Sequence, residues 1–434
     1  MIWLLLACTS APPDTAVSDT ADTDTDTDTD TDTDTDTDTD TDTDTDTDTD
    51  TDTGTTIDPI DADAHGWFAD LDCDDTNASV WPGAPEHCDG VRNDCDATGW
   101  TGTEETGLAA WIDAAGVYTD LTATFAAGTD AAAVPWTLPD EGTVNLCQGE
   151  WYVAMESASA TTVSIVGVWG ADATGWSSDS DTGRSLFLAT GGEDVRVEGL
   201  RMHDGEGGPD RGDISGRSGG VVYLGGGSLT LVDMVVEANQ ARNGGAIYTD
   251  TATLTTSGTR FVDNYGDAGG VLYMVHTDAT FTDTVFADNS AYMRSGAGGA
   301  IVHLGSGALV LDTCEVTGNF AAIAGGIYAP MTATVLTDTV ISGNISSSHP
   351  AIRGSEVTCN KSGSVTAGFL QNVGVGDTDA GSPAVWAATS FVSNGCDFGT
   401  GAADNTGGDV GVPDGATYTY GDDATFSCDT AGCY

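Results

Sequence analysis

The acidic residues at the start of the segment 61–96 have the spacing of a metal-binding loop. Asp61, Asp63, His65, Gly66 and Asp72 occupy positions 1, 3, 5, 6 and 12 of a twelve-residue calcium-binding loop. Calcium takes about six to eight oxygen ligands, and alternate acids on a turning loop direct their carboxylates towards one centre. His65 replaces the usual Asp or Asn, and Asp72 replaces a longer, bidentate Glu. We therefore expect a calcium loop of reduced affinity, or one in which water completes the coordination.

The residues that follow this loop contain further acids, three cysteines and a proline–glycine turn. These elements are Asp72–Asp75, Pro82–Glu86, Cys88–Gly90 and Asn93–Asp96. In order and spacing they resemble the MopE-like metal-binding motif of bacterial surface proteins, and the resemblance covers about residues 61–97. It implies a metal site, whose candidate ligands are Asp61, Asp63, His65, Asp72, Asp74, Asp89, Asp94 and Asp96. Arg92 stands where members of that family usually carry an acid, and a cation there would repel a metal from the second half of the motif.

Three interpretations of this module remain open. Calcium is favoured by the many carboxylates, because hard divalent cations prefer oxygen ligands. Copper is the alternative, because the namesake of the family binds it and His65, His87, Trp67 and Trp81 could support such a site. A disulfide-bonded acidic module without a functional metal is the third. The segment is poor in aliphatic residues, so metal and disulfides would have to hold it together.

A repeat of about 25 residues dominates the longer part of the chain. Gly-Gly pairs begin at 219, 244, 269, 298 and 325, and asparagines follow at 239, 264, 289, 319 and 344. Three residues before each asparagine lies an apolar residue: Val236, Phe261, Phe286, Val316 and Ile341. Because these features recur together over five copies, they indicate a solenoid in which equivalent residues stack.

Alternating runs within each copy predict short strands. Ala246-Ile247-Tyr248 and Ala279-Thr280-Phe281-Thr282 are examples of such runs. Two or three strands and tight turns fit one coil of a parallel β-helix, with the asparagines bonded into a ladder. A propeller blade or a leucine-rich repeat would need another period. The Gly-Gly-Ala-Ile and Phe-x-x-Asn elements resemble the right-handed β-helix repeats of the pectin-lyase-like superfamily, including polymorphic outer-membrane proteins, over about residues 140–395. The resemblance implies an all-β, right-handed parallel β-helix.

The beginning of the sequence predicts export and anchoring. Leu5-Leu6-Ala7-Cys8 resembles a bacterial lipobox, which implies cleavage before Cys8 and lipidation of its thiol. Every second residue from Asp22 to Asp52 is aspartate, a composition that cannot bury a core and repels itself. We expect a lipid anchor followed by a disordered stalk in the bacterial cell envelope, at the outer membrane or cell surface. A simply cleaved secretion signal is the alternative. No segment has the roughly 18 apolar residues needed to cross a bilayer.

Composition restricts the partners. The formal net charge is −58, and the tract Asp22–Asp52 accounts for 16 of the 69 acids, so the rest of the chain is strongly acidic too. Such a field repels nucleic acid and anionic membranes and attracts divalent cations. Ten cysteines fit an oxidising compartment. Their pairing cannot be deduced from sequence, but Cys147 and Cys314 lie in apolar runs and are expected to be buried thiols.

Function is less constrained than fold. We expect a non-catalytic surface protein whose β-helix flank binds glycan or another protein. The alternative is a lyase or glycoside hydrolase acting on acidic polysaccharide, for which the loop after Leu200 supplies acids, bases and a histidine. These candidates are Arg201, His203, Asp204, Glu206, Asp210, Arg211 and Asp213. Tyr223, Tyr248, Tyr273 and Tyr328 recur in phase, as in a stacking ladder or, alternatively, a sugar-binding platform. His276 and His303 are expected to face solvent or pack beside strands.

The predicted organisation has five parts. They are a lipoprotein signal (1–8), an acidic linker (9–56), a calcium-binding module (57–100), a β-helix (108–395) and a C-terminal disulfide-containing cap (396–434).

Overall fold

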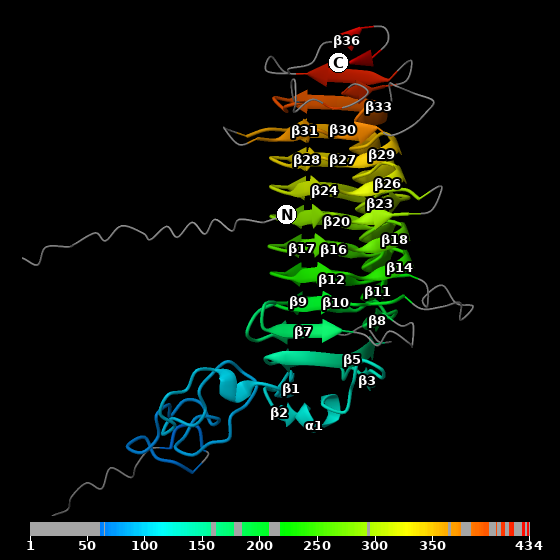
Figure 1. Cartoon of the computed structure of the whole chain (residues 1–434). Coiled ribbons are helices and arrows are strands. Elements are labelled where there is room, and N and C mark those ends of the chain that lie inside the picture. Colours follow the sequence, from blue (N-terminus) through cyan, green and yellow to red (C-terminus); the bar gives the residue numbers. More distant parts are fainter. Residues whose placement is uncertain are drawn as a thin grey trace, which may run out of the picture. The chain divides into compact units, whose positions relative to one another are not determined.

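Short parallel strands, one above the next, form the coils of a β-helix in this computed structural model (Figure 1). The structure describes residues 61–64, 66–157, 162–177, 185–207, 218–292, 296–362, 366–374, 383–398, 405, 409–412, 416–420, 428–429 and 432–433. Cys8, the acidic tract, His65, Asp210, Arg211 and Asp213 lie outside these residues, as do the side chains of Cys428 and Cys433. None of the helices within the described ranges is long and apolar enough to span a membrane.

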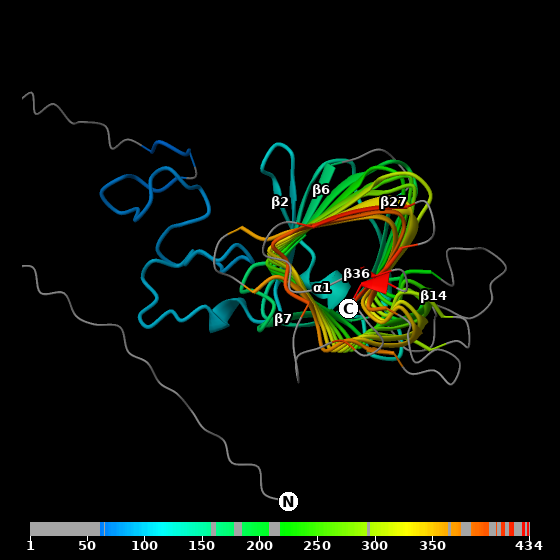
Figure 2. The same ribbon diagram turned by 90° about the horizontal axis from the view of Figure 1, so that it is seen from above.

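The coils contribute strands to three columns, which Figure 2 shows superimposed when viewed down the stack. The first column has two strands per coil. One set is β8 (Phe187–Ala189), β11 (Val222–Gly225), β15 (Ile247–Asp250), β19 (Leu272–Val275) and β23 (Ile301–Leu304). The other is β9 (Asp194–Glu198), β12 (Ser228–Val232), β16 (Thr253–Ser257), β20 (Asp278–Thr282) and β24 (Ala308–Asp312). In the last coils these sets merge into β27 (Ile327–Thr337), β30 (Ile352–Asn360) and β33 (Val385–Asn394).

The other two columns have one strand per coil. The second is β7 (Thr174–Ser177), β10 (Arg201–His203), β13 (Val235–Glu237), β17 (Arg260–Val262), β21 (Val285–Ala287), β25 (Glu315–Thr317), β28 (Val340–Ser342) and β31 (Gly368–Leu370). The third, a separate six-stranded sheet, is β14 (Gln240–Asn243), β18 (Tyr265–Ala268), β22 (Ser290–Ala291), β26 (Phe320–Ile323), β29 (Ile345–Ser348) and β32 (Val373–Gly374). All pairings within these columns are parallel, which confirms the predicted β-helix.

Turns between columns require left-handed backbone at matching positions in successive coils. The first residue of each of the first four Gly-Gly pairs has φ between 64° and 66°. The fifth pair differs from the predicted phase, because Ala324 (φ 54°) takes this position and Gly325 follows it. His349 (φ 57°) takes it in the next coil. Glycine adopts this conformation without the steric cost that a Cβ atom brings, so its repetition reflects the turn geometry.

The predicted asparagine ladder is confirmed. The Oδ1 of Asn289 accepts hydrogen bonds from the backbone N–H (2.9 Å) and Nδ2 (3.0 Å) of Asn264, while its own Nδ2 donates to Asn319 (2.9 Å). Each Nδ2 also donates to a backbone carbonyl, as Asn264 does to Val236 (2.9 Å). The ladder continues through two residues that the repeat analysis did not include, Asn372 and Asn405. These amide side chains are buried, and buried polar groups need hydrogen-bond partners. The ladder supplies these partners, so the turn can be buried.

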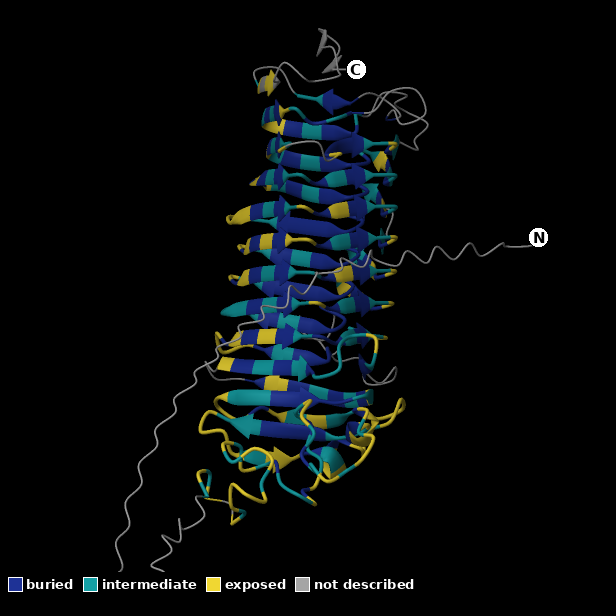
Figure 3. Cartoon of the chain, turned by 90° about the vertical axis from the view of Figure 1, so that its left-hand side faces the viewer, coloured by how far each residue is buried: buried dark blue, intermediate teal, exposed yellow. Residues whose placement is uncertain are grey.

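The interior of the coils is filled by apolar side chains at the predicted alternating positions, and Figure 3 shows the resulting pattern of burial. All five apolar residues that precede the repeat asparagines are fully buried. Phe261 stacks on Phe286 with ring centroids 5.0 Å apart, and Phe281 meets Phe286 edge-on. Stacking like on like follows from the parallel register, which places Phe261 directly opposite Phe286.

The first coil is closed by antiparallel and helical elements. A hairpin of β1 (Ala109–Asp113) and β2 (Tyr118–Asp120) lies against β4 (Gly142–Leu146). The remaining elements here are the 3-10 helix η1 (Thr103–Glu105), α1 (Thr122–Phe125), β3 (Val134–Thr137), β5 (Gly149–Ser157) and β6 (Thr162–Gly167). Phe125 of α1 packs edge-on against Trp136 and Trp151. This cover protects a terminal coil that would otherwise expose its core, as solenoids require.

At the other end, β33 pairs with β34 (Val410–Gly411) and β35 (Thr417–Tyr420). The last two strands, β36 (Cys428–Asp429) and β37 (Gly432–Cys433), pair antiparallel.

Three disulfides are present among the described cysteines: Cys73–Cys95, Cys88–Cys147 and Cys359–Cys396. The prediction that Cys147 is a buried thiol is therefore wrong. Its apolar surroundings were interpreted correctly, since it is fully buried, but its partner Cys88 comes from the acidic module. The prediction for Cys314 is confirmed, because it is a buried free thiol whose pKa burial raises to about 12.

Candidate functional site

The acidic loop 61–75 closes on itself through its own carboxylates. Gly66, at φ 106°, donates its backbone N–H to Oδ2 of Asp61 (2.9 Å). The N–H of Ala62 donates to Oδ1 of Asp75 (3.0 Å), which joins the start of the loop to its end. One carboxylate oxygen of each of Asp61, Asp63 and Asp72 is shielded from solvent. Asp75 was not among the predicted ligands, although the Asp74-Asp75 pair signalled it.

The later acids of the module organise tight turns. Asp74 Oδ1 accepts hydrogen bonds from the backbone and hydroxyl of Thr76, and Asp89 Oδ1 accepts one from Val91 N–H (2.8 Å). Asp94 Oδ1 accepts from Gly83 N–H (2.7 Å) and from the N–H of Asp96 (3.1 Å). Bonds from an Asp side chain to the backbone two residues later are the Asx turns that shape loops without a core.

Arg92 lies over the second acidic loop. Its Nε donates to the carbonyl oxygen of Asp94 (2.8 Å), and its Nη2 donates to the carbonyl oxygen of Cys95. Backbone carbonyls are common calcium ligands, so this guanidinium takes up oxygens that a second cation would need. The cationic residue identified from sequence thus has a defined position within the loop.

The predicted metal ligands are not gathered into a finished metal centre. In the described part of the chain, no group of three or more His, Cys, Asp or Glu side chains is close enough together to hold an ion. The chemistry of the donors in the module fits a hard cation, because the described candidates are all carboxylates. The arrangement brings acids from 61–63 and 72–75 to one loop, and it places Asp89, Asp94 and Asp96 in a separate loop linked to the first by Cys73–Cys95.

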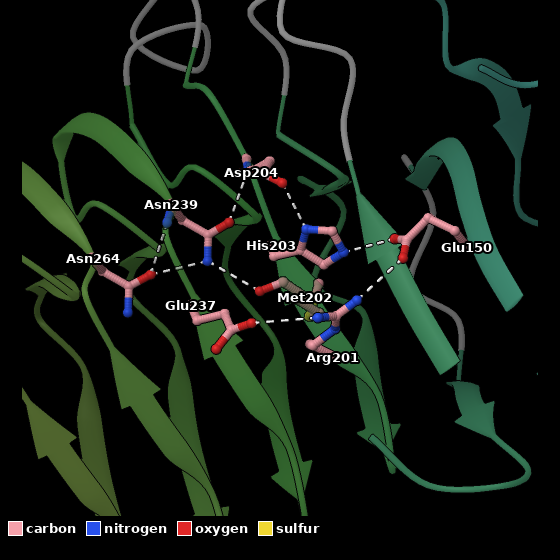
Figure 4. A network of polar contacts seen from close by, with 9 residues as sticks. Glu150, Arg201, Met202, His203, Asp204, Glu237, Asn239 and Asn264 are labelled. Carbon is pink, nitrogen blue, oxygen red and sulfur yellow. Dashed lines mark hydrogen bonds and ion pairs between the residues drawn. The ribbon is translucent and has the colours of Figure 1, made fainter. Parts of the chain in front are cut away.

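A second charged cluster lies on the outer face of the β-helix (Figure 4). The two ring nitrogens of His203 lie 2.7 Å from Glu150 Oε1 and 2.7 Å from Asp204 Oδ2. Arg201 lies between Glu150 (3.3 Å) and Glu237 (3.6 Å). Glu150 belongs to β5 and reaches β10 because Gly175 lies between them and has no side chain. A Cβ at Gly175 would lie 2.3 Å from Glu150 Oε2.

The electrostatics of this cluster favour a charged histidine. The hydrogen bond to Glu150, more than that to Asp204, raises the pKa of His203, against the lowering effect of its burial. An imidazolium can donate to both carboxylates at once. Both ring nitrogens of His203 are thus engaged by carboxylates of the same chain. Glu150 could not be found from sequence, since only the strand register brings it to His203.

The tyrosine column is a stacking ladder over three coils. Ring centroids are 4.9 Å apart between Tyr223 and Tyr248 and 5.8 Å apart between Tyr248 and Tyr273, with nearly parallel planes. Val302 separates Tyr273 from Tyr328, over whose ring Arg353 lies instead. Within this stack, the ring faces between Tyr223, Tyr248 and Tyr273 are covered by one another.

The two histidines considered in the repeat have different environments. His276 is exposed, whereas His303 is fully buried, with Nε2 donating to the Thr277 carbonyl and Nδ1 accepting from the Thr332 hydroxyl (both 2.6 Å). Burial lowers the pKa of His303. His303 therefore provides hydrogen-bond partners for the buried Thr277 carbonyl and the Thr332 hydroxyl.

A groove of about 490 Å³ follows a corner of the β-helix between the first and second columns. Its lining includes Trp169, Asp172, Glu198, Asp233 and Arg260. It combines an aromatic side chain with charges of both signs.

Fold and site together define a β-solenoid protein that carries a metal-binding motif. Residues 72–99 match the family model of copper-binding MopE, described as a "putative metal-binding motif". Comparison with curated proteins and with solved structures gives no match.

Proposed function

We propose that this chain is a bacterial surface lipoprotein in which a calcium-binding module precedes a β-helix that binds glycan or protein partners without catalysis. The metal assignment depends on one observation: the acid-rich loop 61–75, closed by the bonds to Asp61 and Asp75, leads directly into the matched motif. Asp61, Asp63, Asp72 and Asp74 are the proposed ligands, with His65 as an additional one. A bound ion would cross-link the loop 61–75, which has almost no apolar core.

Calcium is proposed over copper on the chemistry of the available donors. Cys73 and Cys95 are joined in a disulfide, which removes two thiolates that would favour a soft metal. His87 stacks on Tyr118, with ring centroids 4.1 Å apart and an interplanar angle of 13°. This ring is engaged in packing, so the module offers mainly carboxylates.

Metal analysis of the whole chain tests the assignment. Isothermal titration calorimetry with calcium chloride and, separately, copper(II) should show calcium binding that is lost in the double variant Asp61→Asn, Asp72→Asn. Asp172→Asn and Glu198→Gln together form the matched control, because they remove two acids outside the module. The full chain is required, since a fragment ending before Cys147 would leave Cys88 without its disulfide partner. Copper binding that survives the presence of calcium would contradict the proposal.

The proposed location is the cell envelope, with Cys8 as the lipidated residue and 9–56 as an acidic spacer. Expression in a bacterial host with labelled fatty acid should label the wild-type chain, and Cys8→Ser should remove the label and release the protein from membranes. An unlabelled wild-type chain recovered in the medium would instead support simple secretion.

The proposed partner surface is the groove at the corner of the β-helix. Binding of the whole chain to glycan arrays and to cell surfaces, compared with that of Arg260→Glu, tests it. Blank arrays and identical cell binding by the variant would count against this part of the proposal.

A further inference from the structure

The acidic module is fixed to the first coil of the β-helix by covalent and apolar contacts. Cys88 is disulfide-bonded to Cys147, and its carbonyl oxygen accepts a hydrogen bond from Asn145 Nδ2 (2.8 Å). A small apolar cluster of Cys88, Ala110 and Cys147 is packed against Leu108, Tyr118, Val168 and Trp169. The module and the coil are therefore held together at the residues that lead into the second acidic loop.

Glu105 is the polar centre of this junction. It is fully buried and lies in η1, outside the matched motif. Its carboxylate accepts hydrogen bonds from the N–H of Gly90 (3.1 and 3.2 Å) and from Nε1 of Trp169 (2.9 Å). Burial raises the pKa of Glu105 to about 7. One side chain thus joins the residue after Asp89 to a tryptophan of the β-helix.

A second route joins Trp169 to the acidic loop. The Trp169 ring lies 5.8 Å from that of Trp100, whose Nε1 donates to Oε2 of Glu86 (3.1 Å). Glu86 in turn accepts hydrogen bonds from the backbone N–H groups of Asn93 (3.3 Å) and Asp94 (3.2 Å). The chain passes close beneath Trp169 at Gly102, where a Cβ would lie 2.2 Å from the ring.

We propose that Glu105 and Trp169 are positioning residues of the metal-binding module, so that metal occupancy and the order of the first coil are coupled. The inference rests on the proposed calcium binding. A chain of contacts connects Trp169 to the loop 86–94, and the disulfide Cys73–Cys95 connects that loop to the loop 61–75. Coupling is reciprocal, so a change in the junction that weakens calcium binding must equally reduce the stabilisation that calcium gives to the coil.

A pair of tryptophan variants separates positioning from general destabilisation. Trp169→Phe keeps an aromatic ring but removes the indole N–H that binds Glu105. Trp176→Phe is the matched control, because Trp176 is a buried β-helix residue whose Nε1 donates to Val153 O (2.8 Å) without contacting the module. Calorimetric titration of the full chain with calcium chloride should give a dissociation constant raised about three- to tenfold in Trp169→Phe, the net contribution of one ordinary hydrogen bond. Trp176→Phe should lower the melting temperature and raise the dissociation constant less than Trp169→Phe does, because its indole bonds the first coil at Val153 without reaching Glu105.

A second comparison guards against a misfolded variant. Glu105→Gln retains one acceptor oxygen and should weaken calcium binding less than Glu105→Ala does. Hydrogen exchange supplies the reverse readout: calcium should increase protection of β1, β4 and β6 but not of β20 and β21. Equal dissociation constants in wild type and Trp169→Phe, or equal shifts in both tryptophan variants, would overturn the coupling alone. A wild-type chain that binds no calcium would overturn the proposed function and the coupling with it.

Discussion

The acidic module and the β-helix of this chain are stabilised in opposite ways. The module consists of turns in which carboxylates accept backbone hydrogen bonds, and two disulfides link it internally and to the first coil. The β-helix depends on repetition, since each coil provides the next with a backbone edge, an apolar layer and an asparagine. Loss of one side chain should therefore affect the module locally, whereas in the β-helix it should disturb the neighbours above and below.

The largest effect is expected in the aromatic stack of the core. Phe286→Ala removes a fully buried ring that packs on Phe261 and Phe281. Because a cavity remains between two coils, the free energy of unfolding should fall by about 3–5 kcal/mol. Urea denaturation followed by far-UV circular dichroism measures this change. Calcium affinity should stay at the wild-type value, and a large loss of affinity would show that the two regions are not energetically separate at this distance.

The converse experiment removes the internal cross-link of the module. Replacing Cys73 and Cys95 together by Ser opens a bridge with a sequence separation of 22 residues, which should cost the module about 3 kcal/mol. We expect calcium binding to disappear while the β-sheet spectrum and the main thermal transition change little. The matched control is Cys314→Ser, which changes a buried free thiol in the β-helix and should show the opposite pattern.

Repetition also explains what could be predicted from sequence. Equivalent residues such as Asn264 and Asn289 recur at a fixed interval, so their stacking followed from spacing alone. Asn372 and Asn405 were missed because no Gly-Gly pair lies between Asn344 and Asn405 to mark the last coils as copies of the repeat. Within the module, the acid spacing predicts a metal loop, whereas the hydrogen bonds of Arg92 to the carbonyl oxygens of Asp94 and Cys95 could not be deduced. The partners of Cys147 and Gly90 could not be deduced, because they depend on how the module meets the first coil.

The cluster around His203 offers a smaller effect on the β-helix surface. Gly175→Ala places a Cβ where Glu150 Oε2 now lies, so Glu150 must leave the ring. The folded-state pKa of His203 is raised, so its contribution to stability is complete below the unfolded value of about 6.5 and is lost as the pH rises through the folded value. The variant should show a lower pKa of His203 by NMR, and a loss of stability relative to wild type that is larger well below pH 6.5 than at alkaline pH. Gly225→Ala serves as the control, because its backbone is not left-handed and a Cβ there would make only ordinary contacts, the nearest at 3.7 Å. An unchanged His203 titration in Gly175→Ala would exclude Glu150 as the cause.

The smallest effect concerns the number of ions that the module holds. Arg92→Glu removes the guanidinium from the carbonyl oxygens of Asp94 and Cys95 and adds a carboxylate next to Asp89, Asp94 and Asp96. Oxygen ligands without a competing cation attract calcium, so the variant should bind a second, weaker calcium ion that the wild type lacks. Calorimetric stoichiometry on the full chain measures this, and Arg92→Gln separates the removal of the cation from the addition of the acid. If both variants keep the wild-type stoichiometry, the second loop is shaped by its Asx turns alone and Arg92 serves only to fasten its backbone.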